Sequence, residues 1–182
     1  MRMSRAATER SRARIIDEAG KMVRARGVEG ASVADVMQAA GMTHGGFYKH
    51  FESKDELLAQ AAAAAFAEVQ GRFDRRAASK GAEAARSAYV AEYLSAKHIA
   101  HPELGCPVAA FGADAGRRPE ALARAFSEGV GALIERMAGE GGSRSEAIGK
   151  LLVLVGAVVA ARAVGEGPLR KEILAAARGD EP

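Results

Sequence analysis

The sequence predicts an all-α protein. It has 182 residues, of which 48% are hydrophobic, but no tryptophan and only five prolines. Alanine is abundant and strand-forming residues cluster only in one late stretch, so helix propensity dominates the chain. A chain of this length can bury one compact core or two smaller cores that share a helix. Its helical pattern divides into short helices at 1–52 and a longer helical segment at 53–182.

The first predicted helix covers about Thr8 to Arg26 and ends at Gly27. Apolar residues recur along it at helical spacing, which predicts one buried face made of Ile15, Ala19, Met22 and Val23. A basic arm at 1–7 precedes this helix, and further arginines follow at positions 10, 12 and 14. Such an arm can contact phosphates, although a solvated tail is at least as good an interpretation for Arg2 and Arg5.

A two-turn helix is predicted after Ser32. Ser32 suits the N-cap, with Asp35 at the third helical position as in a capping box. Gly41 closes the helix as the residue after its C-cap. The side predicted to be buried carries Val33, Val36, Met37 and Ala40.

The segment Gly41-Met42-Thr43-His44-Gly45-Gly46-Phe47-Tyr48-Lys49-His50-Phe51 combines two aromatic anchors with a polar face. Phe47 and Phe51 lie four residues apart and therefore share a helical face. Gly45 and Gly46 disfavour a helix but let the backbone approach a large partner closely. A short helix of this kind is typical of recognition in the DNA major groove. A surface turn between two packed helices is the alternative interpretation.

A long helix is predicted from Ser53 to about Phe73. The second capping box, Ser53-Lys54-Asp55-Glu56, opens it. Five consecutive alanines at 61–65 make it stiff and thin, which suits a rod that joins two units. Glycine and alanine at 71–81 then predict a bend.

These residues resemble the tetracycline-repressor (TetR) family of one-component bacterial regulators. The resemblance is carried by Ser32-Val33-Ala34-Asp35-Val36, by the segment at 41–51 and by Ser53-Lys54-Asp55-Glu56-Leu57-Leu58, and it covers roughly residues 8–60. It implies a three-helix helix-turn-helix DNA-binding domain at 1–52. A long helix would join this domain to a helical effector-binding and dimerisation domain at 53–182.

The resemblance implies a transcriptional regulator, most often a repressor, that binds a palindromic operator as a homodimer and is released by a small-molecule or electrophile effector. His44 and Gly45 then occupy base-reading positions on double-stranded DNA. Residues that the resemblance places near phosphates are Ser32, Thr43, Tyr48, His50 and Lys54, with Lys49 suited to either role. The charge distribution agrees, because residues 1–54 hold ten Lys/Arg against six Asp/Glu, whereas residues 55–182 hold sixteen against seventeen.

Five helices are predicted after the bend. They cover 83–100, Pro107 to about Asp114, Pro119 to about Gly139, Ser143 to about Gly165, and Leu169 to Ala177. Proline and histidine at 98–107 separate the first two, and the glycines at 139–142 form a loop. Pro107 suits the first position of its helix.

The helix at 143–165 predicts dimerisation. No residue from Leu151 to Ala161 is charged, so this stretch is apolar on every side and must be covered on every side. A twofold partner is the simplest cover, and complete enclosure by neighbouring helices is the alternative. The predicted interface, assisted by residues 168–178, contains Leu151, Leu152, Val155, Val158, Val159 and Arg162.

The effector itself is not identified by the sequence. A pocket is expected between the helices at 83–100, 107–114 and 119–139. Its predicted lining residues, each of which also suits the core, are Phe66, Tyr89, Tyr93, Cys106, Phe111 and Phe126. A helical DNA-binding protein without an effector is an alternative, and it would lack this pocket.

Cys106 allows a further alternative. It is predicted at the N-cap of the short helix, where the helix terminus favours a thiolate. Some members of the family carry a cysteine near this point that reacts with electrophiles or oxidants, so the resemblance permits a thiol-based redox sensor. An isolated cysteine is more commonly a small buried hydrophobe. His98 and His101 with Cys106 form only a weak metal pattern, and we predict no metal site.

No catalytic motif is visible, so the sequence predicts no enzyme, no catalytic residues and no cofactor. The single cysteine excludes an internal disulfide and fits a reducing cytoplasm. No apolar signal core follows the basic N-terminus, and the run from Leu151 to Ala161 is shorter than the about 20 residues that span a bilayer. We therefore expect a cytoplasmic protein without a membrane segment.

Overall fold

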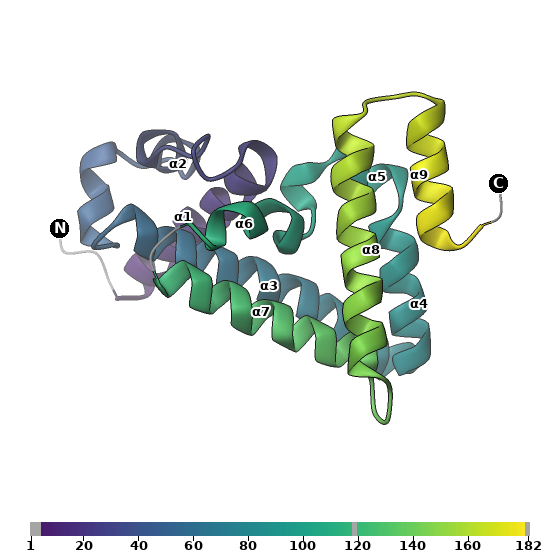
Figure 1. Cartoon of the computed structure of the whole chain (residues 1–182). Helices are drawn as coiled ribbons and strands as arrows, with labels where there is room; N and C mark the ends of the chain where they lie inside the picture. Colours follow the sequence, from purple (N-terminus) through teal and green to yellow (C-terminus); the bar gives the residue numbers. More distant parts are fainter. Residues whose placement is uncertain (1–4, 118–119, 181–182) are drawn as a thin grey trace.

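The computed structural model describes residues 5–117 and 120–180, and within these ranges every regular element is a helix (Figure 1). The elements, with η for a 3₁₀-helix, are α1 (Arg5–Arg26), α2 (Val33–Ala39), η1 (His44–Lys49), α3 (Lys54–Lys80), α4 (Ala82–Tyr93), α5 (Ala96–Ala100), η2 (Pro102–Leu104), α6 (Pro107–Ala115), α7 (Glu120–Ala138), α8 (Arg144–Ala163) and α9 (Pro168–Arg178). The predicted all-α fold class is confirmed.

The helices α1, α2 and η1, called the N-terminal unit below, enclose a small core together with the first turns of α3. Its buried members are Ile15, Ala19, Val36, Met37, Ala40, Phe47, Phe51, Leu57 and Ala61. The buried face predicted for α1 is confirmed except at Met22, which is only partly buried. Within the described residues α1 begins at Arg5, earlier than predicted, and Arg2 of the basic arm lies outside them.

Local sequence signals set both ends of α2. The Asp35 backbone N–H donates to Ser32 Oγ over 3.1 Å, which confirms the predicted N-cap. Gly41 takes a φ of +72°, and its N–H donates to the Gln38 carbonyl over 2.9 Å. The N–H of Met42 reaches back to the Met37 carbonyl over 2.8 Å, which completes a Schellman motif. The left-handed conformation explains why glycine closes this helix.

Helix α3 is longer than predicted. The N–H of Glu56 donates to Ser53 Oγ over 3.1 Å, so the predicted cap is confirmed. The predicted bend is wrong at its start, because the helix continues through Gly71 to Lys80 and the chain turns only at Gly81, where φ is +88°. Val69 and Phe73 flank Gly71 and are buried. Their packing outweighs the about 1 kcal/mol that one glycine costs a helix.

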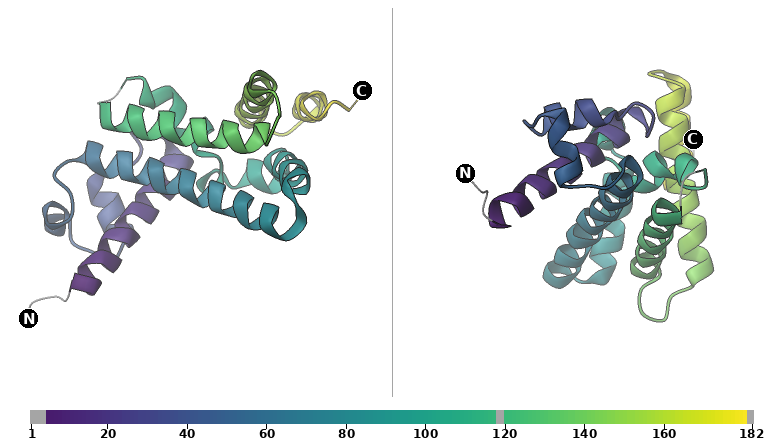
Figure 2. Two further views of the ribbon diagram at one scale, coloured as in Figure 1. Left: turned by 90° about the horizontal axis from the view of Figure 1, so that it is seen from below. Right: turned by 90° about the vertical axis from the view of Figure 1, so that its left-hand side faces the viewer.

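Helix α7 lies beside α3 along most of its length (Figures 1 and 2). A side chain at Gly129 of α7 would lie 2.2 Å from the Phe66 ring of α3, so glycine is required for this close approach. Phe66 also packs edge-on against Phe126, with ring centroids 5.8 Å apart. The predicted start of α7 at Pro119 lies outside the described residues.

A second core joins the N-terminal unit to the helices α4–α9, called the body below. It combines α1 and its following loop with α3, α6 and α7, and its buried members are Val23, Val28, Ala31, Leu58, Ala62, Phe111, Ala115 and Leu122. The Val28 N–H also faces Asp114 Oδ2 at 3.4 Å, which adds a polar contact between the loop and α6. The N-terminal unit is therefore packed against the body as well as joined to it.

The predicted single helix at 83–100 is wrong. The chain forms α4, breaks at Leu94 and Ser95, and continues as α5. Ser95 ends the first helix because its hydroxyl donates to the Glu92 carbonyl over 2.7 Å and accepts from the His98 N–H over 3.2 Å. A serine that bonds to the backbone in this way favours caps over helix interiors. Pro107 opens α6, as predicted.

Helix α8 crosses the end of α7 and packs beside α9, and both α8 and α9 are seen end-on in the left view of Figure 2. Only one side of α8 is buried, and its exposed large side chains, with relative exposures from 36% to 65%, are Ile148, Leu152, Val153 and Val159. An exposed apolar face of α8 thus remains on the single chain. Along the described residues, no helix has both the length and the apolar character needed to cross a membrane.

Candidate functional site

The segment that follows α2 is a 3₁₀-helix, η1, and not the α-helix that its aromatic spacing predicts. Gly45 and Gly46 favour helices poorly, and a six-residue segment makes few α-helical hydrogen bonds. Phe47 and Phe51 nevertheless face the same way, with their rings stacked at 5.5 Å between centroids. These two buried rings anchor η1 on the core of the N-terminal unit.

The outer face of η1 is polar and open. Tyr48 is 76% exposed although it is a large aromatic residue, and Thr43, His44, Gly45 and Lys49 are exposed beside it. A Cβ built on Gly45 would meet no atom within 4 Å, and its φ is not positive. Neither the packing nor the backbone of the chain requires glycine there. The face can therefore bring backbone and polar side chains close to a large external partner.

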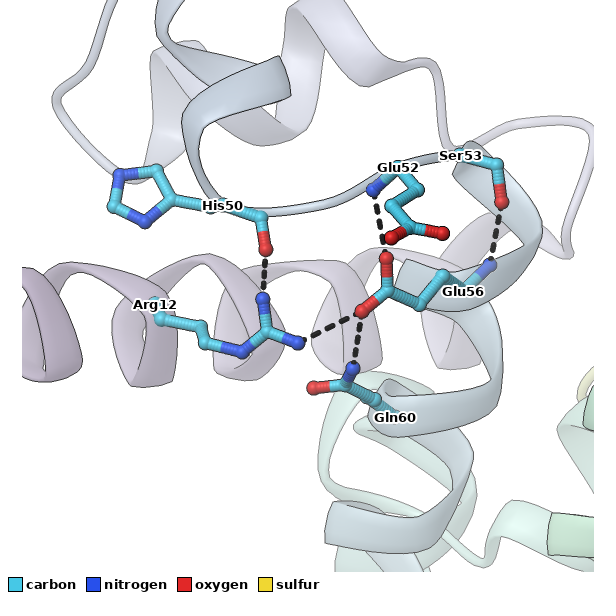
Figure 3. Close-up of polar contacts among 6 residues, drawn as sticks. All are labelled: Arg12, His50, Glu52, Ser53, Glu56 and Gln60. Carbon is cyan, nitrogen blue, oxygen red and sulfur yellow. Dashed lines mark hydrogen bonds and ion pairs between the residues drawn. The ribbon is translucent and has the colours of Figure 1, made fainter.

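Arg12 of α1 fixes the end of this segment (Figure 3). Its guanidinium donates to the His50 carbonyl through Nη1 and, over 2.8 Å, to Glu56 Oε1 through Nη2. The same group lies over the Phe51 ring, 4.3 Å from the centroid. Cation–π contact and charge-assisted hydrogen bonds act together here. Arg12 therefore ties the chain after η1 to both α1 and α3.

Glu56 is the acidic centre of the same network (Figure 3). The Glu52 backbone N–H donates to its Oε2 over 2.7 Å, and Gln60 Nε2 donates to its Oε1 over 2.8 Å. The Glu52 N–H first, and then Arg12, lower the pKa of Glu56 below its usual value. Because these donors stabilise the ionised carboxylate, the network is complete at neutral pH.

His50 is neutral at pH 7. Burial, followed by repulsion from Arg12 and Lys49, lowers its pKa. Its Nδ1 is buried and has no hydrogen-bond partner within the ranges 5–117 and 120–180. The neutral imidazole can donate one hydrogen bond to a phosphate, but it adds no positive charge to the contact.

A cavity of about 110 Å³ lies in the body, between the C-terminal half of α3, α4, α5 and η2. Its walls include Val69, Phe73, Tyr89, Tyr93, Leu104 and Cys106, and its polar or charged residues are Arg72, Arg76, Glu92, Ser95, Lys97, His98 and His101. Both ring nitrogens of His98 are occupied, because Nδ1 lies 2.6 Å from the Tyr93 carbonyl and Nε2 accepts from the Cys106 N–H over 3.0 Å. Burial lowers the pKa of His98, in agreement with a neutral ring.

One buried arginine links this cavity to the N-terminal unit. Arg24 of α1 is only 8% exposed, and its Nε donates to the Glu103 carbonyl over 2.7 Å. Its Nη1 also lies 3.8 Å from Glu68 of α3. Glu103 belongs to η2, directly before the cavity residues Leu104 and Cys106.

Comparison with known proteins identifies the chain. Residues 15–68 match the family model described as bacterial regulatory proteins, tetR family. Within residues 15–68 the chain is therefore of the TetR family. It is accordingly a DNA-binding transcription regulator of the helix-turn-helix type. No curated protein matches the chain by sequence.

Several solved structures, among them TetR-family regulators, share the whole fold. The TetR transcriptional regulator from Legionella pneumophila is 15% identical, covers 98% of each chain and has a TM-score of 0.76. One from Agrobacterium tumefaciens is 18% identical over 96% of this chain and 100% of that one, with a TM-score of 0.77. The reduced form of E. coli NemR is 16% identical over 94% and 96%, with a TM-score of 0.73. At these identities the likeness establishes the fold alone.

The structure separates the predicted DNA-binding residues into two groups. Thr43, His44, Gly45, Tyr48 and Lys49 form the outer face of η1, as the TetR resemblance implies. Thr43 occupies the N-cap position, but its side chain makes no capping hydrogen bond. Ser32 and Lys54 are partly engaged within the chain, since Ser32 Oγ donates to Asp35 Oδ2 over 2.6 Å and Lys54 Nζ donates to the Val28 carbonyl over 3.2 Å.

The predicted effector residues are brought together only in part. Tyr89, Tyr93 and Cys106 line the cavity. Phe66, Phe111 and Phe126 do not, because they pack against α3, α6 and α7 away from it. The expected lining by the helices at 107–114 and 119–139 is also wrong, because neither contributes a residue to the cavity wall. The size of an aromatic side chain does not show whether it lines the cavity or packs in the core. The cationic residues at 72, 76 and 97, which do line the cavity, were the sequence signal that the prediction did not use.

Some of the α8 residues predicted at the dimer interface are exposed on the chain, and others are buried inside it. Leu151 and Val158 are 3% and 0% exposed within the chain, so they belong to its own core and have no surface left for a partner. Leu152 and Val159 are exposed, and Val155 is partly buried. Arg162 is turned inward, where Nη2 donates to the His98 carbonyl over 2.6 Å and Nε to the Ile99 carbonyl over 3.3 Å.

Cys106 does not have the environment expected of a reactive thiol. It is at the N-cap of α6, and Val108 N–H donates to its sulfur over 3.3 Å. Burial nevertheless raises the pKa of the thiol, so Cys106 fits the small buried hydrophobe better than the alternative of a reactive thiolate. In the described part of the chain, no group of three or more histidine, cysteine or acidic residues is arranged to hold a metal ion.

Proposed function

We propose that this TetR-family regulator is a repressor that binds a palindromic operator in the cytoplasm as a homodimer and is released by a small molecule in the body cavity. The single observation that carries the proposal is the outer face of η1. Exposed Tyr48, Lys49 and His44 stand on a segment that two buried rings and Arg12 hold in place. A rigid backing of this kind lowers the ordering cost of binding.

Dimerisation is supported by the exposed apolar face of α8. Leu152, Val153 and Val159 expose from 48% to 65% of their surface on one helix. A contiguous exposed apolar surface marks an association site, and a twofold axis covers it with a second copy of itself. A dimer would also present two η1 segments to two half-sites of DNA.

Release by an effector is supported by the contacts between the cavity and the N-terminal unit. Arg24 bonds to the carbonyl of Glu103 in η2, and α3 supplies both the cavity wall and the base of the N-terminal unit. A ligand that alters the packing of η2 or α3 would bias the separation of the two η1 segments. By linkage, DNA would then weaken ligand binding by the same factor. The role requires no catalytic step and no cofactor.

The test begins with selection of bound duplexes from random-sequence DNA. Affinity for the selected duplex is then measured by fluorescence anisotropy at several salt concentrations. A Tyr48→Ala/Lys49→Ala variant should bind far more weakly, and loss of one lysine–phosphate contact should lower the salt slope by about one. His44→Ala should change the selected sequence, because a base-reading residue sets preference.

Lys80→Ala is the matched control, since Lys80 is exposed at the other end of α3. It should bind the duplex as the parent does. Unchanged affinity and salt slope in a folded Tyr48→Ala/Lys49→Ala variant would contradict the proposed interface.

Two alternatives are less well supported. A thiol-based redox sensor through Cys106 needs a reactive thiolate, whereas burial raises the pKa of this thiol. A DNA-binding protein without an effector would have no use for a cavity with polar groups in its wall. Thermal shift with small molecules distinguishes this second alternative, because a ligand of the folded state raises the apparent stability.

A further inference from the structure

The cavity contains two polar groups that the fold leaves unsatisfied. The hydroxyl oxygens of Tyr89 and Tyr93 are buried, and neither has a nitrogen or oxygen hydrogen-bond partner among the described residues. The group that both hydroxyls approach is the Cys106 sulfur, a weak acceptor, which places them at the Cys106 end of the cavity. An unpaired buried hydroxyl costs stability, and such a group in a native structure needs an explanation.

Both hydroxyls act as donors. Burial raises the pKa of each tyrosine well above its usual value, so the phenols stay protonated at neutral pH. The other polar groups at this end are occupied, since His98 uses both ring nitrogens and Cys106 accepts from the Val108 N–H. The partner that these phenols lack is therefore a hydrogen-bond acceptor.

The charge around the cavity favours a negative acceptor. Arg72 and Arg162 are the cations that act on the hydroxyls of Tyr89 and Tyr93, respectively. Arg72 is paired with Glu68 and Arg76 with Glu92, the latter over 3.3 Å, whereas Lys97 has no ion pair among residues 5–117 and 120–180. The lining residues thus carry more positive than negative charge. Positive charges near a partly dry site stabilise an anion more strongly than they would in water.

The size and the walls favour one aromatic ring. The cavity volume of about 110 Å³ is of the order that holds a benzene-sized molecule. Phe73 and Tyr89 meet edge-on at 6.2 Å, and Tyr89 and Tyr93 lie 5.6 Å apart, so aromatic faces and edges form the wall. Val69 and Leu104 complete the apolar surface. Aromatic ligands pack well against walls of this kind.

We propose that the cavity binds a single-ring aromatic carboxylate, whose carboxylate accepts hydrogen bonds from the Tyr89 and Tyr93 hydroxyls and whose ring packs against Phe73 and Val69. Arg72 and Arg162 offset the cost of bringing the negative charge inside. The inference rests on the proposed function, because it identifies the chemical class of the effector that occupies the same cavity.

The test is isothermal titration calorimetry of the full chain with benzoate and phenylacetate, and with benzamide as the neutral analogue. The parent protein should bind at least one of the two carboxylates at millimolar concentration or below, and benzamide much more weakly. Tyr89→Phe/Tyr93→Phe keeps both rings and removes only the hydroxyls. It should weaken carboxylate binding by more than ten-fold, because hydrogen bonds to charged groups are the strong ones.

Ser87→Ala is the matched control, since it removes a hydroxyl from an exposed position of α4 that is not part of the cavity lining. It should bind the carboxylate as the parent does. Circular dichroism of the double variant shows whether it is folded, and the comparison of carboxylate with amide in the parent tests the charge without any substitution.

The proposal is overturned if neither carboxylate binds the parent, if benzamide binds equally well, or if the folded double variant binds without loss. Affinity for the selected DNA duplex is measured on the same preparations. Intact DNA binding without carboxylate binding rejects the ligand class and leaves the regulator standing. Absence of DNA binding rejects the proposed function, whatever the cavity binds.

Discussion

At the scale of single residues, Arg12 is the side chain on which the geometry of the DNA-binding face depends most. It reaches from α1 to the His50 carbonyl, to Glu56 and to the Phe51 ring, so one guanidinium joins α1, the chain after η1 and the first turn of α3. The sequence placed Arg12 among the arginines of a basic region that contacts phosphate. Its role in the structure is internal, and sequence spacing could not reveal a contact across 38 residues.

Arg12→Met should reduce DNA affinity by roughly three- to ten-fold, since a loosened segment must be ordered again on binding. The salt slope should stay nearly constant, because no phosphate contact is lost. Fluorescence anisotropy at several salt concentrations measures both quantities. Arg75→Met, at an exposed position of α3, is the control. A fall in the salt slope by one unit would instead identify Arg12 as a phosphate contact.

Glu56 should make the stability of the protein depend on pH. Its pKa in the folded chain is lowered from 4.5, so its contribution is complete above the unfolded value and is lost as pH falls through the folded value. The Glu56→Gln variant lacks this contribution. The difference in unfolding free energy between parent and variant should therefore be largest at neutral pH and shrink between about pH 5 and pH 3.

Urea denaturation at several pH values measures this difference. Glu52→Gln is the control, because the Glu52 side chain is exposed. The substitution keeps the Glu52 backbone N–H, which donates to Glu56. A constant difference across the pH range would show that Glu56 is not stabilised as a carboxylate.

Among the elements, the ends of helices were predictable wherever one residue decides them. Ser32, Gly41 and Ser53 act through their own hydroxyl or their own φ, so local sequence is enough. The fate of Gly71 depends instead on the burial of Val69 and Phe73 against distant helices. The cavity combines α3 with α4, α5 and η2, and no local pattern states which faces of these helices meet.

Helix α3 is expected to transmit movement as a rigid rod between the cavity and the N-terminal unit. Ala61, Ala62 and Ala65 are buried, whereas Ala63 and Ala64 are exposed, so only the exposed pair can be changed without disturbing a core. Ala63→Gly/Ala64→Gly should lower the free energy of unfolding by about 2 kcal/mol. The softened rod should also transmit less of the effect of a bound ligand to the DNA-binding face.

The measurement is DNA affinity with and without benzoate, the probe chosen for the cavity. The ratio of the two affinities should move toward one in the glycine variant, while benzoate binding itself stays unchanged. Ala63→Ser/Ala64→Ser, which keeps better helix propensity, is the control. Release of DNA by benzoate to the same extent as in the parent would refute transmission through a rigid α3.

For the whole molecule, the expected assembly is a homodimer through the exposed face of α8. Leu152 is 65% exposed at the middle of this face. Leu152→Glu should produce a monomer, because pairing two copies would bury an unpaired carboxylate from each. Light scattering gives the mass in solution. Tight binding to a palindromic duplex should disappear with the dimer, since each half-site alone offers only part of the contacts.

Ala67→Glu adds the same charge at an exposed position of α3 and should leave the mass unchanged. A Leu152→Glu protein that remains a dimer would move the interface elsewhere. The sequence predicted an open face on this helix but mixed buried with exposed residues in it, because Leu151 and Leu152 are equally apolar and only the fold distinguishes the buried one from the exposed one.

The core shared by α1, α3, α6 and α7 has a consequence for how the chain unfolds and diversifies. Val23 and Val28, from α1 and the loop after it, pack in one core with Leu58, Phe111 and Leu122. Separating the N-terminal unit from the body would therefore expose apolar side chains on both. Heat or denaturant should therefore melt both halves in one cooperative step. DNA-binding specificity could be exchanged between relatives by substituting only the residues on the outer face of η1. Exchanging residues 1–52 as a block would instead pair Val23 and Val28 of one protein with non-matching core residues of the other.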